Sequence, residues 1–232
     1  MFVVKSKFLI LEKIIFFIKK MEVNKEILLE ACVGSFKEAK RAEELGANRI
    51  ELCENLKEGG TTPSFGTILI SKKILKIPIA VMIRPRGGNF IYTSEEIEIM
   101  KEDILICKKL EVESVVFGVL TKDNLIDVAL LKDLIQLCRP LKIVFHMAFD
   151  EIENKLEALK LLIECGVERI LTKGSKTNAI DGINTLKILV ENNQNKIIIV
   201  AGGGVTKDNY IKILNEATVS QCHGTKIVGL LN

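Results

Sequence analysis

Two Glu–Cys pairs with the same spacing are the residues of this sequence best suited to form a reactive pocket. Glu30 lies two positions before Cys32, and Glu51 lies two positions before Cys53. Each pair falls in a short apolar segment that is typical of a β-strand, in which residues two apart point to the same face. If both faces point into one space, two carboxylates and two thiols converge there.

Further polar residues lie at or just after the ends of other predicted strands, where α/β barrels place their chemistry. The chain has only two histidines, His146 and His223, and both end predicted strands, with Asp150 shortly after His146. The candidate catalytic residues are Glu30, Glu51, His146 and Asp150. The candidate substrate-binding residues are Arg84, Arg86, Thr172, Gly203, Gly204 and His223.

Each of these groups also has a purely structural interpretation. A buried cysteine often serves as a small apolar side chain. Glu30 and Glu51 could be neutralised by Arg84 or Arg86, because buried charges need partners. The glycines at 202–204 could form a tight turn instead of a backbone site for an anion. The residues alone leave these alternatives open.

The elements that must position these residues alternate regularly along the chain. Eight predicted strands are separated by amphipathic segments, a pattern that indicates parallel strands joined by right-handed crossovers. Eight such units favour a closed (β/α)8 barrel over an open sheet. The predicted strands are 27–33, 48–53, 79–84, 114–118, 142–146, 169–172, 196–201 and 219–223, and the predicted helices are 36–45, 95–110, 127–138, 155–165, 179–191 and 207–217.

The two ends of the chain depart from this pattern. After the eighth predicted strand only residues 224–232 remain, too few for a closing helix. We therefore expect a barrel domain over 27–232 with a truncated final unit, in which 227–231 cover part of the apolar outer face. Residues 1–26 form an N-terminal extension, either a tail or the product of an upstream start, since Met21 could equally begin the protein.

Composition and charge argue against several classes of function. The first twenty residues carry the net positive charge, and the remainder has no basic stripe for nucleic acid. The apolar run 8–18 is interrupted by Glu12 and Lys13, and it is too short and too charged for a membrane span or a signal peptide. The six cysteines are scattered, as expected of reduced thiols in a cytosolic protein. No glycine-rich nucleotide motif follows the first predicted strand.

Eight short segments, spread from about Ile27 to His223, carry a family resemblance. The most specific is the ordered run VMIRPRGG at 81–88. The others are 29–33 (LEACV), 47–53 (ANRIELC), 58–64 (EGGTTPS), 116–121 (VFGVLT), 145–150 (FHMAFD), 169–172 (RILT) and 202–205 (GGGV). Together they resemble the CutC copper homeostasis family.

The resemblance implies a TIM-type barrel, a cytoplasmic location, with a nuclear one left open as well, and a role in copper handling. It further implies that Cys32 and Cys53 bind Cu(I), which prefers soft thiolates and a low coordination number. Two positions depart from the family pattern. Met147 stands where the family has an arginine, and GTK at 224–226 replaces a Ser-Ala-Arg stretch. Both changes remove cationic groups from the pocket.

Two hypotheses about function follow. In the first, the protein binds Cu(I) through Cys32 and Cys53 and buffers or traffics it in the cytosol. In the second, it is an enzyme whose acid–base groups act on a small anionic or sugar-like metabolite held by Arg84, with an indirect link to copper. The expected partner is therefore a copper ion or a small-molecule ligand, and self-association into a homo-oligomer is left open.

Overall fold

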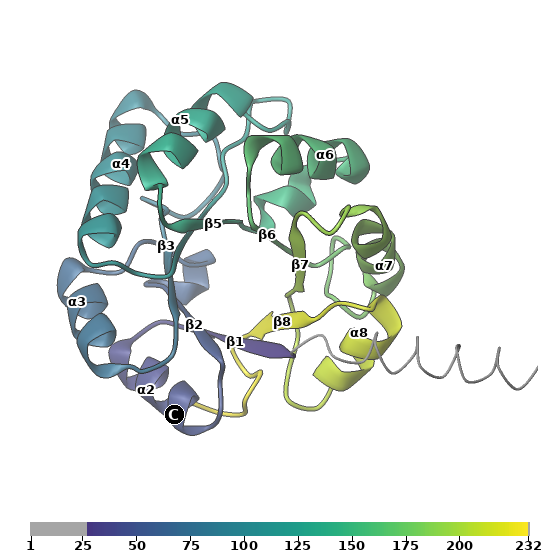
Figure 1. Ribbon diagram of the computed structural model, residues 1–232, viewed down its shortest axis with the longest axis horizontal. Coiled ribbons are helices and arrows are strands. Elements are labelled where there is room, and N and C mark those ends of the chain that lie inside the picture. Colours follow the sequence, from purple (N-terminus) through teal and green to yellow (C-terminus); the bar gives the residue numbers. More distant parts are fainter. Residues whose placement is uncertain (1–26, 232) are drawn as a thin grey trace, which may run out of the picture.

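Eight parallel strands close into a barrel in sequential order, as predicted (Figure 1). The structure, a computed structural model, describes residues 27–231, so the expected extension at 1–26 lies outside the described residues. The strands are β1 (Leu28–Val33), β2 (Arg49–Leu52), β3 (Ile79–Met82), β4 (Ser114–Phe117), β5 (Lys142–Phe145), β6 (Arg169–Thr172), β7 (Ile198–Ala201) and β8 (Gln221–Gly224). β1 pairs with both β2 and β8, which closes the ring.

The helices form a shell around this barrel, and short 3-10 turns lie in two of the connections (Figure 1). The α-helices are α2 (Phe36–Glu44), α3 (Phe65–Ile74), α4 (Ser94–Lys109), α5 (Val128–Cys138), α6 (Lys155–Cys165), α7 (Ile183–Asn192) and α8 (Tyr210–Ala217), and the 3-10 turns are η1 (Leu56–Glu58) and η2 (Met147–Glu151). After β8, residues 225–231 contain no helix, but Ile227, Val228 and Leu231 are buried in the layer between barrel and helices.

Helix α3 is the element that the sequence pattern did not predict. Its sequence, FGTILISKKI, contains a glycine and several β-branched residues, and Phe65, Ile70 and Ile74 are exposed, so no clear apolar stripe marks it as a helix. Ser64 accepts the backbone N–H of Thr67 at 3.2 Å and so caps its first turn. Two parallel neighbours such as β2 and β3 need a crossover, and this tertiary requirement outweighs the local pattern.

Other boundaries differ from the prediction by a few residues. Thr93 caps α4, and it forms a reciprocal capping box with Glu96. Gly46 and Gly166 follow α2 and α6 with φ of +93° and +80°, the left-handed conformation that commonly ends a helix.

Two apolar layers hold the fold together. One lies between the strands and the helices and includes Ile50, Leu52 and Phe117. The other lies inside the barrel and is called here the interior cluster, which consists of Cys32, Cys53, Ala80, Met82, Val116, Val144, Leu171 and Val200. Alternate residues of each strand therefore face opposite layers, and this alternation places Cys32 and Cys53 in the barrel interior.

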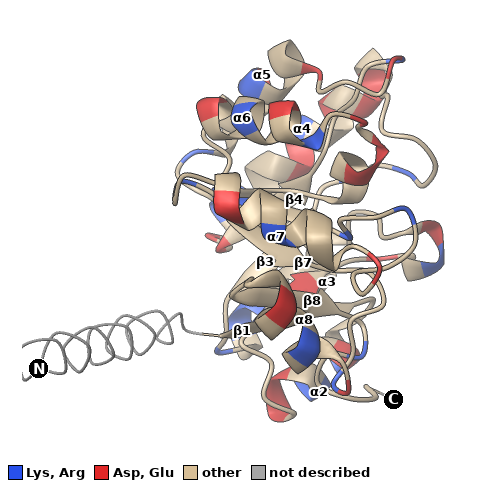
Figure 2. Ribbon diagram, turned by 90° about the vertical axis from the view of Figure 1, so that its right-hand side faces the viewer, with Lys and Arg blue, Asp and Glu red and all other residues tan. Residues whose placement is uncertain are grey.

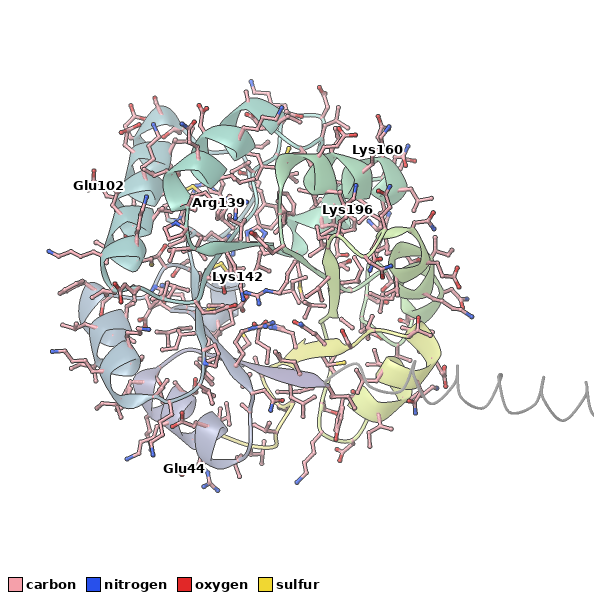
Figure 3. All side chains as sticks on the ribbon, in the orientation of Figure 1. Glu44, Glu102, Arg139, Lys142, Lys160 and Lys196 are labelled. Carbon is pink, nitrogen blue, oxygen red and sulfur yellow. The ribbon has the colours of Figure 1, made fainter. Side chains whose placement is uncertain are left out.

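The charged residues mostly cover the outside of the helical shell. Glu44, Glu102 and Lys160 point outward from it (Figure 3), and basic and acidic residues are interspersed in the view of Figure 2. Within 27–231, no helix has both the length and the apolar character that a bilayer crossing requires.

Candidate functional site

The two cysteines that the sequence singled out face one another inside the barrel. In the β1–β2 register Cys32 lies opposite Glu51, so Cys53 is only two residues further along the neighbouring strand. The sulfur atoms of Cys32 and Cys53 and a carboxylate oxygen of Glu51 all lie within 4.8 Å of one another. Both thiols are buried, and Cys32 also lines a cavity at the barrel mouth.

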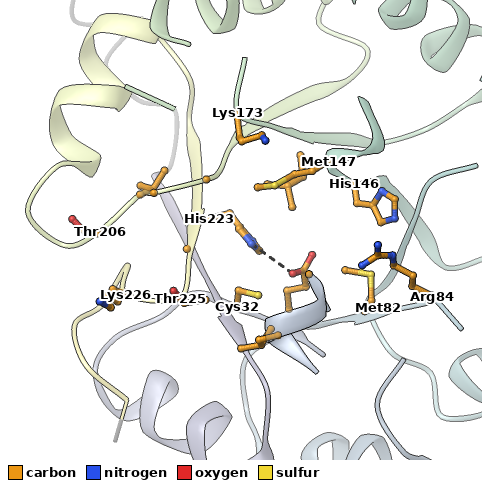
Figure 4. A pocket seen from close by; sticks show the side chains of 18 of the residues that line it. Cys32, Met82, Arg84, His146, Met147, Lys173, Thr206, His223, Thr225 and Lys226 are labelled. Atoms are coloured by element: carbon orange, nitrogen blue, oxygen red, sulfur yellow. Dashed lines mark ion pairs between the residues drawn. The ribbon is translucent and has the colours of Figure 1, made fainter. Parts of the chain in front are cut away.

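A second cluster adjoins the thiols and shares Glu51 with them. His223 Nδ1 lies 2.8 Å from Glu30 Oε1, and His223 Nε2 lies 3.6 Å from Glu51 Oε2, the pair marked in Figure 4. Arg49 donates from Nε to Glu30 and from Nη2 to Gln221 Oε1, the latter at 2.8 Å. The barrel interior thus contains a continuous network of buried charges joined by hydrogen bonds and ion pairs.

The partner of Glu30 differs from the one expected. The sequence suggested Arg84 or Arg86 as its counter-charge, but Arg49 and His223 occupy that role because they lie beside it on the adjacent strands β2 and β8. Burial alone would raise the pKa of Glu30, but the Arg49 charge and the His223 hydrogen bond outweigh it and hold that pKa well below its usual range.

The remaining members of the two clusters have pKa values that favour one thiolate beside one thiol. The hydrogen bond between the cysteines lowers the pKa of Cys32, against the effect of burial, and raises the pKa of Cys53. Burial raises the pKa of Glu51. Burial alone would lower the pKa of His223, but the Glu51 charge and the hydrogen bonds with Cys32 and Glu30 raise it. The thiolate is the form that binds metal ions.

Two methionines bring further sulfur close to the thiols. Met82 belongs to the interior cluster, and Met147 packs against that cluster. Both line the same cavity as Cys32. A β-carbon added at Gly60 would lie 3.2 Å from Cys53 Sγ and 3.6 Å from Met82 Cε, so the Cys53 thiol and the end of the Met82 side chain both lie beside this glycine. The arginine position that Met147 replaces is thus filled by a soft, apolar side chain.

The cavity at the carboxyl ends of the strands has a volume of about 570 Å³. Figure 4 shows His223 on one side of it, with Cys32 nearby, and Arg84 and His146 on the other, with Met82 beside Arg84. A volume of this size exceeds what one metal ion needs and falls in the range of small-molecule sites.

His146 lines this cavity with a defined tautomer. Its Nδ1 accepts the backbone N–H of Ala148 at 3.1 Å, so the proton of the neutral ring is on Nε2. Burial, and then the nearby Arg84 charge, lower the pKa of His146 to about 3, so the ring is neutral. Nε2 has no hydrogen-bond partner within residues 27–231. The ring packs on Phe90, with centroids 4.8 Å apart.

The two arginines of the loop after β3 have different surroundings. Arg84 is buried and lines the cavity, where Nη1 donates to the carbonyls of Glu58 and Gly60 and Nη2 to that of Gly88. Arg86 is not among the cavity-lining residues, because its guanidinium pairs with Glu96 at 2.5 Å.

Asp150 and Thr172 also bond to each other rather than face the cavity. The Thr172 hydroxyl donates to Asp150 Oδ1, and the same carboxylate accepts the backbone N–H of Lys173 at 3.0 Å. Neither side chain lines the cavity, whereas the neighbouring Glu151 and Lys173 do. The Asp150–Thr172 pair therefore fixes the loop that carries Lys173.

Gly203 and Gly204 line the cavity with their backbone. Their φ angles of +85° and +72° lie in the left-handed region, so the turn after β7 requires glycine. A β-carbon at Gly203 would lie 2.4 Å from Lys173 Cγ, so the absence of a side chain also makes room for Lys173.

Sequence reasoning missed three parts of the site. Arg49 lies two residues before Glu51, so the same period-two argument could have placed it in the interior. Gln221 accepts a hydrogen bond from Arg49, but this contact could not be predicted because β8 lies far from β2 in sequence. Lys173 follows the strand end at Thr172 and was overlooked.

Comparisons with known proteins agree with this architecture. The model of the CutC family matches residues 27–228. A human relative described as a copper homeostasis protein cutC homolog is 44% identical over 196 residues, which cover 84% of this chain and 72% of the relative. The CutC family protein of Enterococcus faecalis is 41% identical, with 87% of this chain and all of the relative covered.

Solved structures give the same result. The structure of CutC from Streptococcus agalactiae superposes with a TM-score of 0.83 at 43% identity, covering 87% of this chain and 99% of the other. An aldolase, QR15, has a TM-score of 0.67 at only 14% identity over 90% and 94% of the two chains, which shows the shared TIM-barrel fold alone. On the strength of the family match and these relatives, the chain belongs to the CutC family.

Proposed function

We propose that the protein binds Cu(I) through Cys32 and Cys53 and so buffers or transfers copper inside the cell. The observation that carries this proposal is the buried thiol pair, whose sulfur atoms lie within 4.8 Å of each other. One copper ion can bridge two sulfurs at such a separation after a small side-chain adjustment. Cu(I) suits this site because it favours soft ligands in low coordination number.

The surroundings of the thiols support a univalent soft ion. Apart from the Glu51 carboxylate, the interior cluster around them is apolar and contains Met82, and Met147 packs against it. The lowered pKa of Cys32, caused first by the Cys53 hydrogen bond, supplies a thiolate at neutral pH. The human relative described as a copper homeostasis protein supports the same metal.

Titration of the reduced protein with Cu(I) against a competing chelator tests the proposal. We expect one tightly bound ion in the wild type and none of comparable affinity in the double variant Cys32→Ala, Cys53→Ala. The matched control is Cys107→Ala, Cys138→Ala, which removes two other buried cysteines, from α4 and α5. Equal copper stoichiometry in the two double variants would contradict the proposal.

A further inference from the structure

The cavity beside the thiol pair contains buried polar atoms that Cu(I) binding does not use. Three of its lining side chains each have an atom without a hydrogen-bond partner in the described part of the chain: His146 Nε2, Arg84 Nε and Glu51 Oε1. The three residues are 4%, 5% and 2% exposed. A buried polar atom without a partner costs about 1 to 3 kcal/mol, so three on one cavity indicate a missing partner.

The His146 side of the cavity supplies donors and positive charge. The Ala148 N–H holds the imidazole so that Nε2 carries the proton, and Arg84 adds a second free N–H and a full charge. Both groups are fixed in place, since Arg84 is tied to three carbonyls and both side chains pack on Phe90. A preorganised pair of donors with one cation is suited to an oxyanion.

The opposite side of the cavity requires a different group. Glu51 Oε1 is buried near the thiols, and a hydroxyl complements it because a hydroxyl can both donate and accept. Lys173 and Lys226 also line the cavity, on the loops after β6 and β8, so cationic side chains outnumber acidic ones in the lining.

We infer that this cavity binds a small hydroxylated oxyanion, a carboxylate or phosphate ester of about three to six carbons, with the oxyanion at His146 and Arg84 and a hydroxyl at Glu51. The cavity volume of about 570 Å³ accommodates a molecule of this size. This site goes beyond the proposed copper function, because its oxyanion donors, Arg84 and His146, follow β3 and β5 and lie across the cavity from His223, and neither is a proposed copper ligand.

Calorimetric titration of copper-free, reduced protein tests the inference. The probes are a panel of hydroxylated carboxylates, the corresponding phosphate esters, inorganic phosphate and the neutral polyol glycerol. We expect saturable binding of at least one hydroxylated oxyanion and none of glycerol, and the two oxyanion arms identify carboxylate or phosphate. If inorganic phosphate binds as tightly as every ester, the hydroxyl contact is absent and the inference is wrong. If nothing in the panel binds more tightly than glycerol, it is also wrong.

The variant His146→Phe keeps an aromatic ring against Phe90 but removes the Nε2–H donor. We expect it to weaken binding by at least about tenfold, the effect of losing one hydrogen bond to a charged group. His146→Leu, which also has no donor, serves if the phenylalanine variant does not fold. Lys160→Gln, an exposed change on α6, removes a charge away from the cavity and should leave the affinity unchanged. Equal affinity in the wild type and the His146 variant would overturn the inference. Because no copper is present, failure here leaves the copper titration unaffected.

Discussion

The Cys53 thiol lies 3.6 Å from Oε2 of Glu51, and through this contact the thiol pair joins the buried charge network around Glu30. His223 connects the two carboxylates, with one ring nitrogen toward each. The position and the ionisation of Cys32 and Cys53 therefore depend on the neighbouring charged residues Glu51, Glu30 and His223.

The Glu30–Arg49 pair is expected to be important for stability. Glu30→Gln leaves Arg49 buried without its counter-charge, so we expect the free energy of unfolding to fall by about 3 kcal/mol. The control is Glu98→Gln, which breaks the exposed Glu98–Lys101 pair and should leave the free energy of unfolding nearly unchanged. Urea denaturation of both variants measures the difference. Equal losses in the free energy of unfolding would show that the buried pair contributes no more to stability than the exposed pair.

Gly60 is expected to position the Cys53 sulfur. Gly60→Ala introduces a β-carbon 3.2 Å from Cys53 Sγ at a φ of +88°, so it should both destabilise the protein and weaken Cu(I) binding. Gly46→Ala has a similar φ of +93° but open space around the new carbon. We expect each variant to lose about 1 kcal/mol of stability, with only Gly60→Ala losing copper affinity. Similar copper affinity in both would show that the sulfur position tolerates this displacement.

The reactivity of the cysteines should follow their pKa values. The Cys53 hydrogen bond lowers the pKa of Cys32, whereas burial raises the pKa of Cys107 and Cys138 to about 12. At neutral pH we expect iodoacetamide to alkylate Cys32, which lines the cavity, well before these two. Mass spectrometry of peptides over time measures the order, and prior loading with Cu(I) should protect Cys32. If Cys107 were labelled as fast as Cys32, the lowered pKa of Cys32 would be contradicted.

His146 should make the stability depend on pH in a mildly acidic range. Burial lowers the pKa of His146 to about 3 in the folded protein, whereas the unfolded chain has a value of about 6.5. Between these values only the unfolded state takes up the proton, so the free energy of unfolding falls as the pH falls, with a slope of about 1.4 kcal/mol per pH unit from this group. His146→Phe should remove that part of the slope.

Denaturation of both proteins at several pH values between about 6.5 and 4 measures the two slopes. The lowered pKa of Glu30 adds a separate loss at more acidic pH, because its stabilising contribution disappears only as the pH falls below about 4.3. Unchanged slope in the His146 variant would mean that the folded protein protonates this ring normally.

The sequence was sufficient to predict the barrel and the convergence of Cys32 with Cys53. Regular alternation of strands and helices determines the ring, and period-two alternation determines which strand residues share a face. Helix α3 could not be predicted in the same way, because its β-branched sequence forms a helix only under the constraint of the crossover between β2 and β3.

The partners of the charged residues were harder to predict. Arg84 and Arg86 follow a strand end and were predicted as partners for the buried glutamates. Instead, Arg84 donates to three backbone carbonyls, and Arg86 pairs with Glu96. The carboxylate of Glu30 instead pairs with Arg49, and this pairing depends on the stagger between β1 and β2. Pairing across strands depends on register, and nothing in a single sequence states the register.

The most direct test of the copper proposal is X-ray absorption at the copper edge on protein loaded with one equivalent of Cu(I) under reducing conditions. The account predicts a spectrum dominated by two sulfur neighbours per copper, which disappears in the Cys32→Ala, Cys53→Ala variant and persists in Cys107→Ala, Cys138→Ala. A shell of only nitrogen and oxygen neighbours in the wild type, or an unchanged sulfur shell without Cys32 and Cys53, would contradict it.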